Sequence, residues 1–203
     1  NTFIGFKVAF ANVLGEICNR IGPADVEAVT ATLSLATSRL WDPRSYTRAG
    51  MGDGGGCHPR DNIAMSWLAQ KNRLYHDLFE NLMLCRERHA TNLVYRMLGA
   101  SRQNGNLPLA ILGTAFKADV AIETGSHALL VEAILVRAGH TVEMLADPRK
   151  DWLAEIDCLE PRVFLIGCNH SWIPDFVFPK GSIVIDPWRI VPDRPGVHVH
   201  RIG

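Results

Sequence analysis

The sequence of 203 residues lacks several features that would assign it to a large class of proteins. No apolar run approaches the roughly 20 residues that span a bilayer, and no basic start leads into an apolar signal segment, so we expect no membrane association. Lysine and arginine together number 21, as do aspartate and glutamate, so no overall field attracts nucleic acid. A small polar ligand is the partner that this composition favours.

Cysteine pairs are also absent from the sequence. The five cysteines are odd in number and far apart, without a CxxC pair that would indicate a zinc site or a dithiol redox centre. They are Cys18, Cys57, Cys85, Cys158 and Cys168. This usage favours a reducing compartment, and we expect a cytoplasmic protein without a metal site.

Helical periodicity dominates the first half of the chain. From Phe3 to Ile17, apolar residues recur at spacings of three and four, which is typical of a helix with one buried face. Further helical stretches cover 25–36, 61–71 and 74–98, with a glycine-rich loop over 38–56. We expect a homodimer through the first helix, because its broad apolar stripe needs a covering surface.

The pattern changes after a polar linker at 100–106. Residues 107–113 (LPLAILG) form a short apolar run bounded by turn signals, as buried parallel strands do. Strands at 141–146, 162–167 and 182–185 then alternate with helices at 126–138 and 151–156. The alternation predicts an α/β chain, with a helical domain over 1–103 followed by a Rossmann-like doubly wound parallel sheet over 104–203.

The densest signal for chemistry is the segment 50–61, GMGDGGGCHPRD. Its glycines let the backbone approach a ligand, and Cys57 enters where a helix begins. The positive end of the helix dipole, with His58 and Arg60 nearby, favours a thiolate and therefore a nucleophile. Asp61 lies one helical turn on, where it is suited to orient or deprotonate a water that attacks a cysteine adduct.

The spacing alone leaves other interpretations open. Glycines 54–56 also fit a flexible loop, Cys57 a small buried filler and Asp61 a solvated helix residue, because free cysteine is commonly buried and inert. A cysteine protease is disfavoured, since His58 is adjacent to Cys57 and neighbouring residues rarely face each other as nucleophile and base.

Several motifs in order give the sequence a resemblance to a known family. GDGGGCHPRD (52–61) resembles the active-site loop GYGGSCFPKD of the UDP-glucose/GDP-mannose dehydrogenase family. Asn1-Thr-Phe, at the head of a helix ending in FANVLGEIC, is similar to the family's central dimerisation helix, and Asp42-Pro43-Arg44 to its DPRIG motif. LGTAFK (112–117) resembles the LGLAFK opening of its C-terminal domain, and Val184-Ile-Asp186 its late VIDGRN strand.

The resemblance implies an NAD-dependent enzyme of the UDP-glucose 6-dehydrogenase type, which serves polysaccharide biosynthesis. Such an enzyme oxidises the C6 alcohol of a nucleotide sugar to a carboxylate through a thiohemiacetal and a thioester, here on Cys57. The resemblance assigns the hydrolytic water to Asp61 and Asn1, and the cofactor to Arg60. The residues that it assigns to the substrate are Arg44, which reaches the partner subunit's substrate, Gly54, Gly55, Phe116, Lys117 and Arg189.

Two departures from the family pattern bear on cofactor and substrate. Where the family has DDVRESP, this sequence has Ala121-Ile-Glu-Thr-Gly-Ser-His127, without the arginine that contacts the cofactor. The loop between Arg44 and Cys57 is shorter than the common pattern, and Asp53 stands where an aromatic residue is usual. An acidic side chain there would repel a diphosphate, which predicts an unusual substrate.

Two hypotheses about the whole protein follow. Asn1 is not methionine and the residues after it already have the pattern of a helix interior, so we expect the family's GxGxxG cofactor domain to precede it. Without that domain the chain is not expected to bind NAD properly. The first hypothesis is the C-terminal portion of a nucleotide-sugar dehydrogenase. The second is a non-catalytic nucleotide-sugar-binding or assembly module that lacks the NAD domain.

Overall fold

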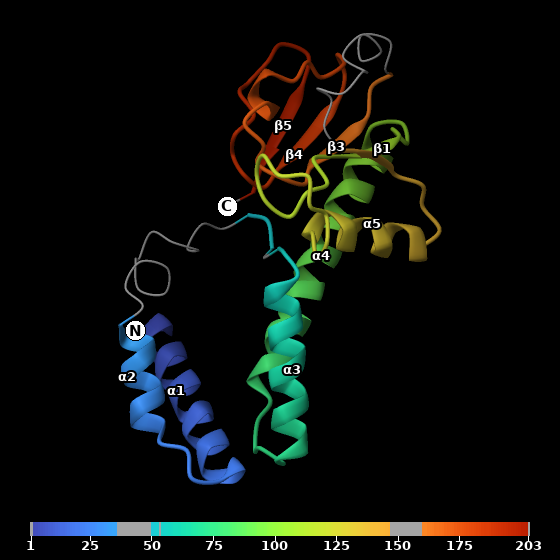
Figure 1. The fold of residues 1–203 in the computed structure, drawn as a ribbon. Coiled ribbons are helices and arrows are strands. Elements are labelled where there is room, and N and C mark those ends of the chain that lie inside the picture. The colour runs from blue at the N-terminus through green and yellow to red at the C-terminus, as the bar shows by residue number, and fades with distance from the viewer. Residues whose placement is uncertain (1, 36–49, 53, 147–159, 203) are drawn as a thin grey trace. The chain divides into compact units, whose positions relative to one another are not determined.

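The computed structural model describes residues 2–35, 50–52, 54–146 and 160–202 (Figure 1). Contacts divide the chain into two compact units. The helical unit consists of residues 1–48 and 60–84, and the sheet unit of residues 49–59 and 85–203. The domain boundary expected between 103 and 104 stays a prediction. The contacts group residues 85–103, the larger part of the helix before this boundary, with the sheet.

Four helices form the first half of the chain, as the periodicity predicts. They are α1 (Thr2–Ile21), α2 (Val26–Ser34), α3 (Cys57–Lys71) and α4 (Leu78–Gln103). In the helical unit, Ile17, Ala69 and Phe79 are buried. Phe10 and Val13 of α1 pack against this cluster, with the Phe10 and Phe79 rings edge to face at 6.5 Å. Part of the apolar stripe of α1 is therefore covered within the unit, while Phe6 remains 44% exposed.

The bounds of α4 differ from the predicted stretch of 74–98. The helix begins at Leu78 because the Asp77 carboxylate accepts hydrogen bonds from the backbone N–H groups of Phe79 (3.1 Å) and Glu80 (3.0 Å), which is N-cap geometry. At its other end the helix continues to Gln103, so the predicted linker at 100–106 is wrong over its first half. Polar residues such as Ser101 and Gln103 are compatible with a helix, and the Ser101 hydroxyl donates to the Leu107 carbonyl at 2.7 Å.

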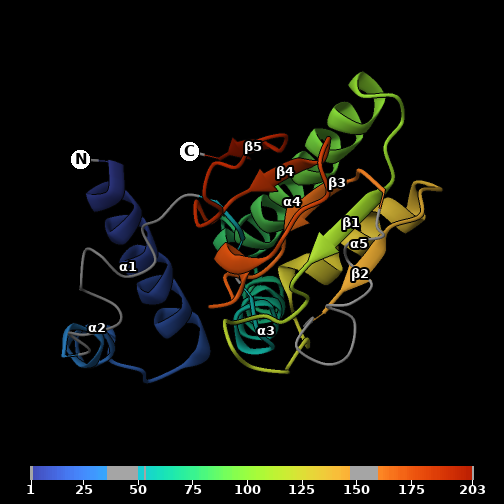
Figure 2. The same cartoon turned by 90° about the horizontal axis from the view of Figure 1, so that it is seen from above.

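A five-stranded parallel sheet forms the second half, which confirms the Rossmann-like fold. Its strands are β1 (Leu109–Leu112), β2 (Glu143–Leu145), β3 (Val163–Ile166), β4 (Ile183–Asp186) and β5 (His198–Arg201). Their order is β2-β1-β3-β4-β5 (Figures 1 and 2). In register, Leu112 pairs with Ile166 and Ile185 with His200. The pattern did not predict β5, whose residues HVHR are polar at three of four positions, and the predicted helix at 151–156 lies outside the described residues.

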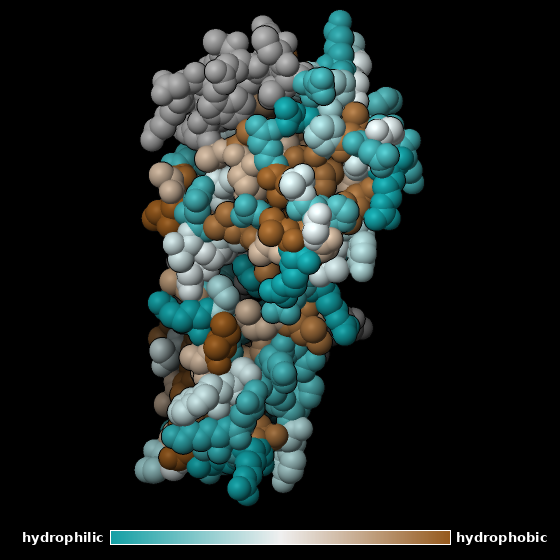
Figure 3. Space-filling model, turned by 90° about the vertical axis from the view of Figure 1, so that its right-hand side faces the viewer, coloured by the Kyte–Doolittle hydropathy of each residue, from teal (hydrophilic) through white to brown (hydrophobic). Residues whose placement is uncertain are grey.

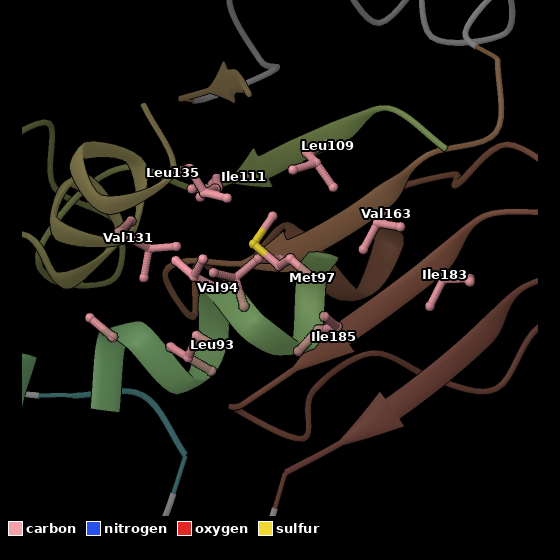
Figure 4. Packing of buried hydrophobic residues seen from close by; sticks show 13 residues of the cluster. Leu93, Val94, Met97, Leu109, Ile111, Val131, Leu135, Val163, Ile183 and Ile185 are labelled. Carbon is pink, nitrogen blue, oxygen red and sulfur yellow. The ribbon is translucent and has the colours of Figure 1, made fainter. Parts of the chain in front are cut away.

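Alternate residues of the strands enter two cores, one on each face of the sheet. On one face, α4 and α5 (His127–Arg137) pack against β1, β3 and β4 (Figure 4). The fully buried side chains of this core include Leu93, Met97, Ile111, Val131, Leu135 and Leu165. On the other face, Phe164 and Val184 pack against the segment 173–178, where Phe164, Phe176 and Phe178 form edge-to-face ring pairs. Burial on both faces explains why these strands are continuous apolar runs.

The described surface carries separate hydrophobic patches among hydrophilic residues on the face drawn in Figure 3. On α3, Ile63 and Trp67 are 58% and 60% exposed, and the Lys71 ammonium lies 4.7 Å from the centre of the Trp67 ring. No helix in the described part of the chain is long and apolar enough to cross a membrane.

Candidate functional site

The carboxyl edge of the sheet is where a fold of this topology binds ligands. The chain leaves β1 toward β2 on one side and returns to β3 on the other, which makes the β1–β3 boundary a topological switch point. Gly113 follows β1 and Gly167 follows β3, and a Cβ on Gly167 would overlap the Gly113 carbonyl oxygen. Only glycine therefore allows the two strand ends to approach this closely.

The glycine segment, which comprises the described residues 50–52 and 54–56 before Cys57, packs against this same edge of the sheet unit. A Cβ on Gly54 or Gly55 would come to 3.0 Å from atoms of Phe116, and one on Gly50 would overlap the Pro187 carbonyl. The Gly55 N–H donates to the Gly125 carbonyl at 3.1 Å. Residues that follow β1 and β4 thus lie against the described residues of this segment.

Cys57 is the first residue of α3, and it is exposed. The sequence predicts this position at the start of a helix, and the structure confirms it. Exposure excludes the interpretation of Cys57 as a buried filler. Its strength as a nucleophile stays a prediction. Cys18, Cys85 and Cys168 are free thiols as well, of which Cys85 is exposed.

Asp61 and Arg60 pair with each other in the first turns of α3. The Arg60 Nε donates to the Asp61 carboxylate at 2.9 Å, and both side chains are exposed. Asp61 lies four residues after Cys57 in one helix, so the predicted spacing of one turn holds. The contacts assign residues from Arg60 onward to the helical unit, so the structure does not place this pair relative to Phe116 or Lys117.

The two other cations assigned to the substrate lie in loops after strands. Lys117 follows Phe116 in the turn after β1, and its side chain is exposed. Arg189 lies in the loop after β4, is exposed and has a φ of 59°. The buried Asp186 carboxylate fixes this loop by accepting hydrogen bonds from the backbone N–H groups of residues 188, 189 and 191. Asn1, Arg44 and Asp53 lie outside the described residues.

Sequence reasoning missed a pair of histidines beneath the glycine segment. The His89 and His127 ring centres lie 5.5 Å apart. His89 Nε2 lies 2.7 Å from the Gly50 carbonyl, to which it donates, and a Cβ on Gly52 would overlap the His127 ring. His127 is 3% exposed, and neither of its ring nitrogens has a hydrogen-bond partner among the described residues. The available signal was the glycine at every second position from 50 to 54, which indicates close neighbours.

Lowering the pH is expected to destabilise the fold through His127. Burial lowers the pKa of His127 from 6.5 to about 3, with Arg86 and His89 adding to the effect. Between these values the unfolded chain binds a proton that the folded chain does not, so the free energy of unfolding falls as the pH drops below 6.5. The loss is about 2 kcal/mol at pH 5, and urea denaturation at pH 7 and pH 5 measures it.

The matched controls for this expectation are two histidine variants. His127→Leu should remove most of the pH dependence, whereas His198→Leu, on the exposed strand β5, should leave it unchanged. An identical loss of stability at pH 5 in the wild type and in His127→Leu would contradict the assignment to His127.

A second polar cluster follows β3 at the same edge. Asp119 accepts hydrogen bonds from the Ser171 N–H (3.1 Å) and hydroxyl (2.9 Å), and its own N–H donates to His170 Nδ1 at 2.9 Å. The His170 ring stacks on Trp172 at 5.4 Å. Burial raises the pKa of Cys168 to about 11, which makes it a poor nucleophile. The chemically accessible thiol of the sheet unit's carboxyl edge is therefore Cys57.

Other sites in the described residues offer less. A pocket of about 570 Å³ opens at the amino ends of β1 and β2, the edge opposite the glycine segment, where Arg102, His140 and Glu143 contribute to its wall. No group of three or more histidine, cysteine, aspartate or glutamate side chains in the described ranges is placed to hold a metal ion.

Comparison with known proteins shows similarity to one dehydrogenase family. Residues 1–87 match the sequence model of the UDP-glucose/GDP-mannose dehydrogenase family, central domain. UDP-glucose 6-dehydrogenase TuaD of Bacillus subtilis is 29% identical over 143 residues, and the UDP-glucose 6-dehydrogenase of Rickettsia prowazekii is 27% identical over 139 residues. The chain is therefore similar in sequence to the UDP-glucose/GDP-mannose dehydrogenase family. The two pairwise matches cover 70% and 67% of this chain, but only 30% and 31% of the two relatives.

The fold of this chain is also that of a solved dehydrogenase. A crystal structure of a ternary complex of GDP-mannose dehydrogenase from Pseudomonas aeruginosa superposes with a TM-score of 0.75 at 21% sequence identity. The match covers 98% of this chain and 50% of that one. The likeness confirms the fold, with helices followed by a parallel sheet.

Proposed function

We propose that the chain is part of an NAD-dependent nucleotide-sugar 6-dehydrogenase that oxidises the C6 alcohol of a nucleotide sugar to a carboxylate. The observation that carries the proposal is Cys57, an exposed thiol at the first position of α3, directly after a glycine segment packed on Phe116. The match of residues 1–87 to the central domain of the UDP-glucose/GDP-mannose dehydrogenase family and the similarity to UDP-glucose 6-dehydrogenases support it.

The proposed chemistry uses Cys57 as a covalent nucleophile. Loss of a hydride and a proton converts the C6 alcohol to an aldehyde, and the Cys57 Sγ adds to the aldehyde carbon to give a thiohemiacetal. Loss of a second hydride from the carbon and a proton from the hydroxyl leaves a thioester. Water then attacks the thioester carbon, the C–S bond breaks, and a carboxylate and the free thiol are released. Asp61, one turn along α3, is the base proposed for that water, together with Asn1.

NAD is proposed to bind mainly outside the described residues. Arg60 is the one residue assigned to the cofactor, and its Nε is held by Asp61. The turn after β1, Gly113-Thr-Ala-Phe116, lacks the GxGxxG arrangement that holds a dinucleotide, and Phe116 contacts Gly54 and Gly55. We therefore assign the acceptor of both hydrides, NAD, to a part of the enzyme outside this sequence.

The sheet unit is proposed to hold the nucleotide sugar. Lys117 and Arg189 are exposed cations in the turns after β1 and β4, at the edge where parallel sheets bind ligands. A diphosphate would accept charge-assisted hydrogen bonds from both. In the proposed homodimer, which forms through α1, Arg44 of one subunit would contact the substrate of the other.

The proposal is tested with the native-length protein. With NAD and a panel of UDP- and GDP-sugars, we expect one sugar to yield two NADH per molecule oxidised. The absorbance of NADH, read when the progress curve reaches its plateau, measures this ratio. A single NADH per sugar would refute oxidation to the carboxylate. No NADH from any sugar, combined with nucleotide-sugar binding that Cys57→Ser leaves unchanged in calorimetry, would instead support a non-catalytic binding module.

A further inference from the structure

Two histidines of the sheet unit, His89 and His127, contact the glycine segment at two separate points. His89 lies on α4 and donates from Nε2 to the Gly50 carbonyl at 2.7 Å. His127 opens α5, where Ser126 is the N-cap residue, and its ring lies where a Cβ on Gly52 would be. The rings are tilted by 38° at 5.5 Å from each other, so one imidazole supports the other against the segment.

In this arrangement the buried His127 ring lies directly against the backbone of Gly52. His127 is 3% exposed, and its ring nitrogens have no hydrogen-bond partner in the described ranges. A buried polar ring costs free energy when it is not hydrogen-bonded. The ring nevertheless fills the place of a Cβ on Gly52, so its position limits how closely the Gly52 backbone can approach α5.

The contacts extend from the histidines toward Cys57. The Arg86 guanidinium donates to the Gly125 carbonyl at 3.3 Å, and the same carbonyl accepts from the Gly55 N–H at 3.1 Å. Gly55 is two residues before Cys57. Residues of α4 and of the start of α5 therefore hold the segment at Gly50, Gly52 and Gly55, and the segment leads directly into the first turn of α3.

We propose that His89 and His127 are positioning residues for the Cys57 thiol. They hold residues 50–52 and 54–56 on the carboxyl edge of the sheet, and this support determines where α3 begins and where the Cys57 side chain lies. The inference rests on the proposed function only in its consequence for catalysis. The positioning itself is a property of the folded chain and is measurable without turnover.

The first experiment compares two replacements of His89 in the native-length protein. His89→Leu removes the donor to the Gly50 carbonyl, whereas His89→Gln keeps an N–H donor of similar reach. Hydrogen exchange followed by mass spectrometry reports on the peptide that contains Gly55, and iodoacetamide alkylation reports on Cys57. We expect His89→Leu to lower the protection of the segment about tenfold and to change the Cys57 alkylation rate at least severalfold, and His89→Gln to restore both.

The exposed Cys85 thiol and the amides of β1 and β4 are internal references. Unchanged references together with a changed segment support positioning. If His89→Leu also exposes the strand amides, the residue only stabilises the fold, and the proposal is wrong. Equal protection and equal alkylation in both variants would overturn it as well.

The second experiment uses the contact between Gly52 and His127. Gly52→Ala places a methyl group on the His127 ring, so we expect the segment to lose protection and the Cys57 alkylation rate to change. His127→Ala removes the ring, and the double variant should recover at least half of the wild-type protection because the overlap is gone. Losses that simply add in the double variant would show that the two residues do not act through each other, which contradicts the proposal.

Turnover distinguishes this inference from the proposed function. If the native-length enzyme is active, His89→Leu should lower kcat more than it changes KM, since it displaces a nucleophile and not the bound sugar. If no nucleotide sugar is oxidised, the proposed function fails, while the exchange and alkylation results still decide whether the two histidines position Cys57.

Discussion

Replacing Cys57 by serine is expected to lower carboxylate formation by the native-length enzyme at least about a thousandfold, which corresponds to ~4 kcal/mol of lost transition-state stabilisation. A serine hydroxyl is a much weaker nucleophile than a thiolate at neutral pH, so the covalent route through a thioester is lost. The measurement is the amount of sugar carboxylate formed over time, by chromatography with mass detection, alongside NADH.

The second exposed thiol of the described residues provides the matched control. Cys85 lies on α4 and is exposed like Cys57, so Cys85→Ser makes the same chemical change on a different helix. It should leave the rate within about twofold, since surface substitutions away from special features have small effects. Full carboxylate formation by Cys57→Ser, or equal losses in the two variants, would exclude Cys57 as the nucleophile.

Replacing Gly167 by alanine is expected to lower the free energy of unfolding by about 3 kcal/mol, at the upper end of the usual cost of overpacking. A Cβ at this position would overlap the Gly113 carbonyl, lie 2.8 Å from the Ala128 Cβ and 3.0 Å from the Ile111 Cγ2. These atoms belong to the backbone or to buried side chains, so none of them moves aside cheaply. Denaturation in urea, followed by circular dichroism, measures the change.

Gly99 supplies the opposite case for the same substitution. It lies inside α4, and a Cβ there would meet nothing within 4 Å. Gly99→Ala should raise stability by about 0.5–1 kcal/mol, because alanine loses less backbone entropy in a helix. A Gly167→Ala protein as stable as the wild type would show that the two strand ends are free to separate.

The sequence predicts four of the five strands of the described sheet. β1, β3 and β4 are uninterrupted apolar runs buried on both faces, and each lies within its predicted range or one residue from it. The edge strand β2 lies within its predicted range because it keeps the apolar residues Met144 and Leu145, whereas β5, at the other edge, is polar at three of four positions and was not predicted. The sequence did not predict the ends of α4, because a capping aspartate sets its beginning and helix-compatible polar residues extend its end. Apolar periodicity indicates neither.

The site was predictable where one short segment carries it. Cys57 at the start of a helix follows from the local pattern of glycines and the residues after them. Phe116 could be named from a resemblance, but its packing on Gly54 and Gly55 depends on how distant segments fold together. His89 and His127 are 38 residues apart in the sequence, and both are far from the glycine segment, so no local pattern connects them with it. Only the folded chain shows that the His127 ring occupies the place that a Cβ on residue 52 would take.

The polar edge strand has a consequence for how copies of the protein behave when crowded. An outer strand offers unpaired backbone groups to any other strand, and proteins that leave such an edge hydrophobic tend to aggregate through it. In β5, His198, His200 and Arg201 are exposed, and Arg201 is tied back to Asp193 and the Val191 carbonyl. A second sheet adding to this edge would have to strip water from charged and imidazole groups, so the sheet ends here instead of continuing from molecule to molecule.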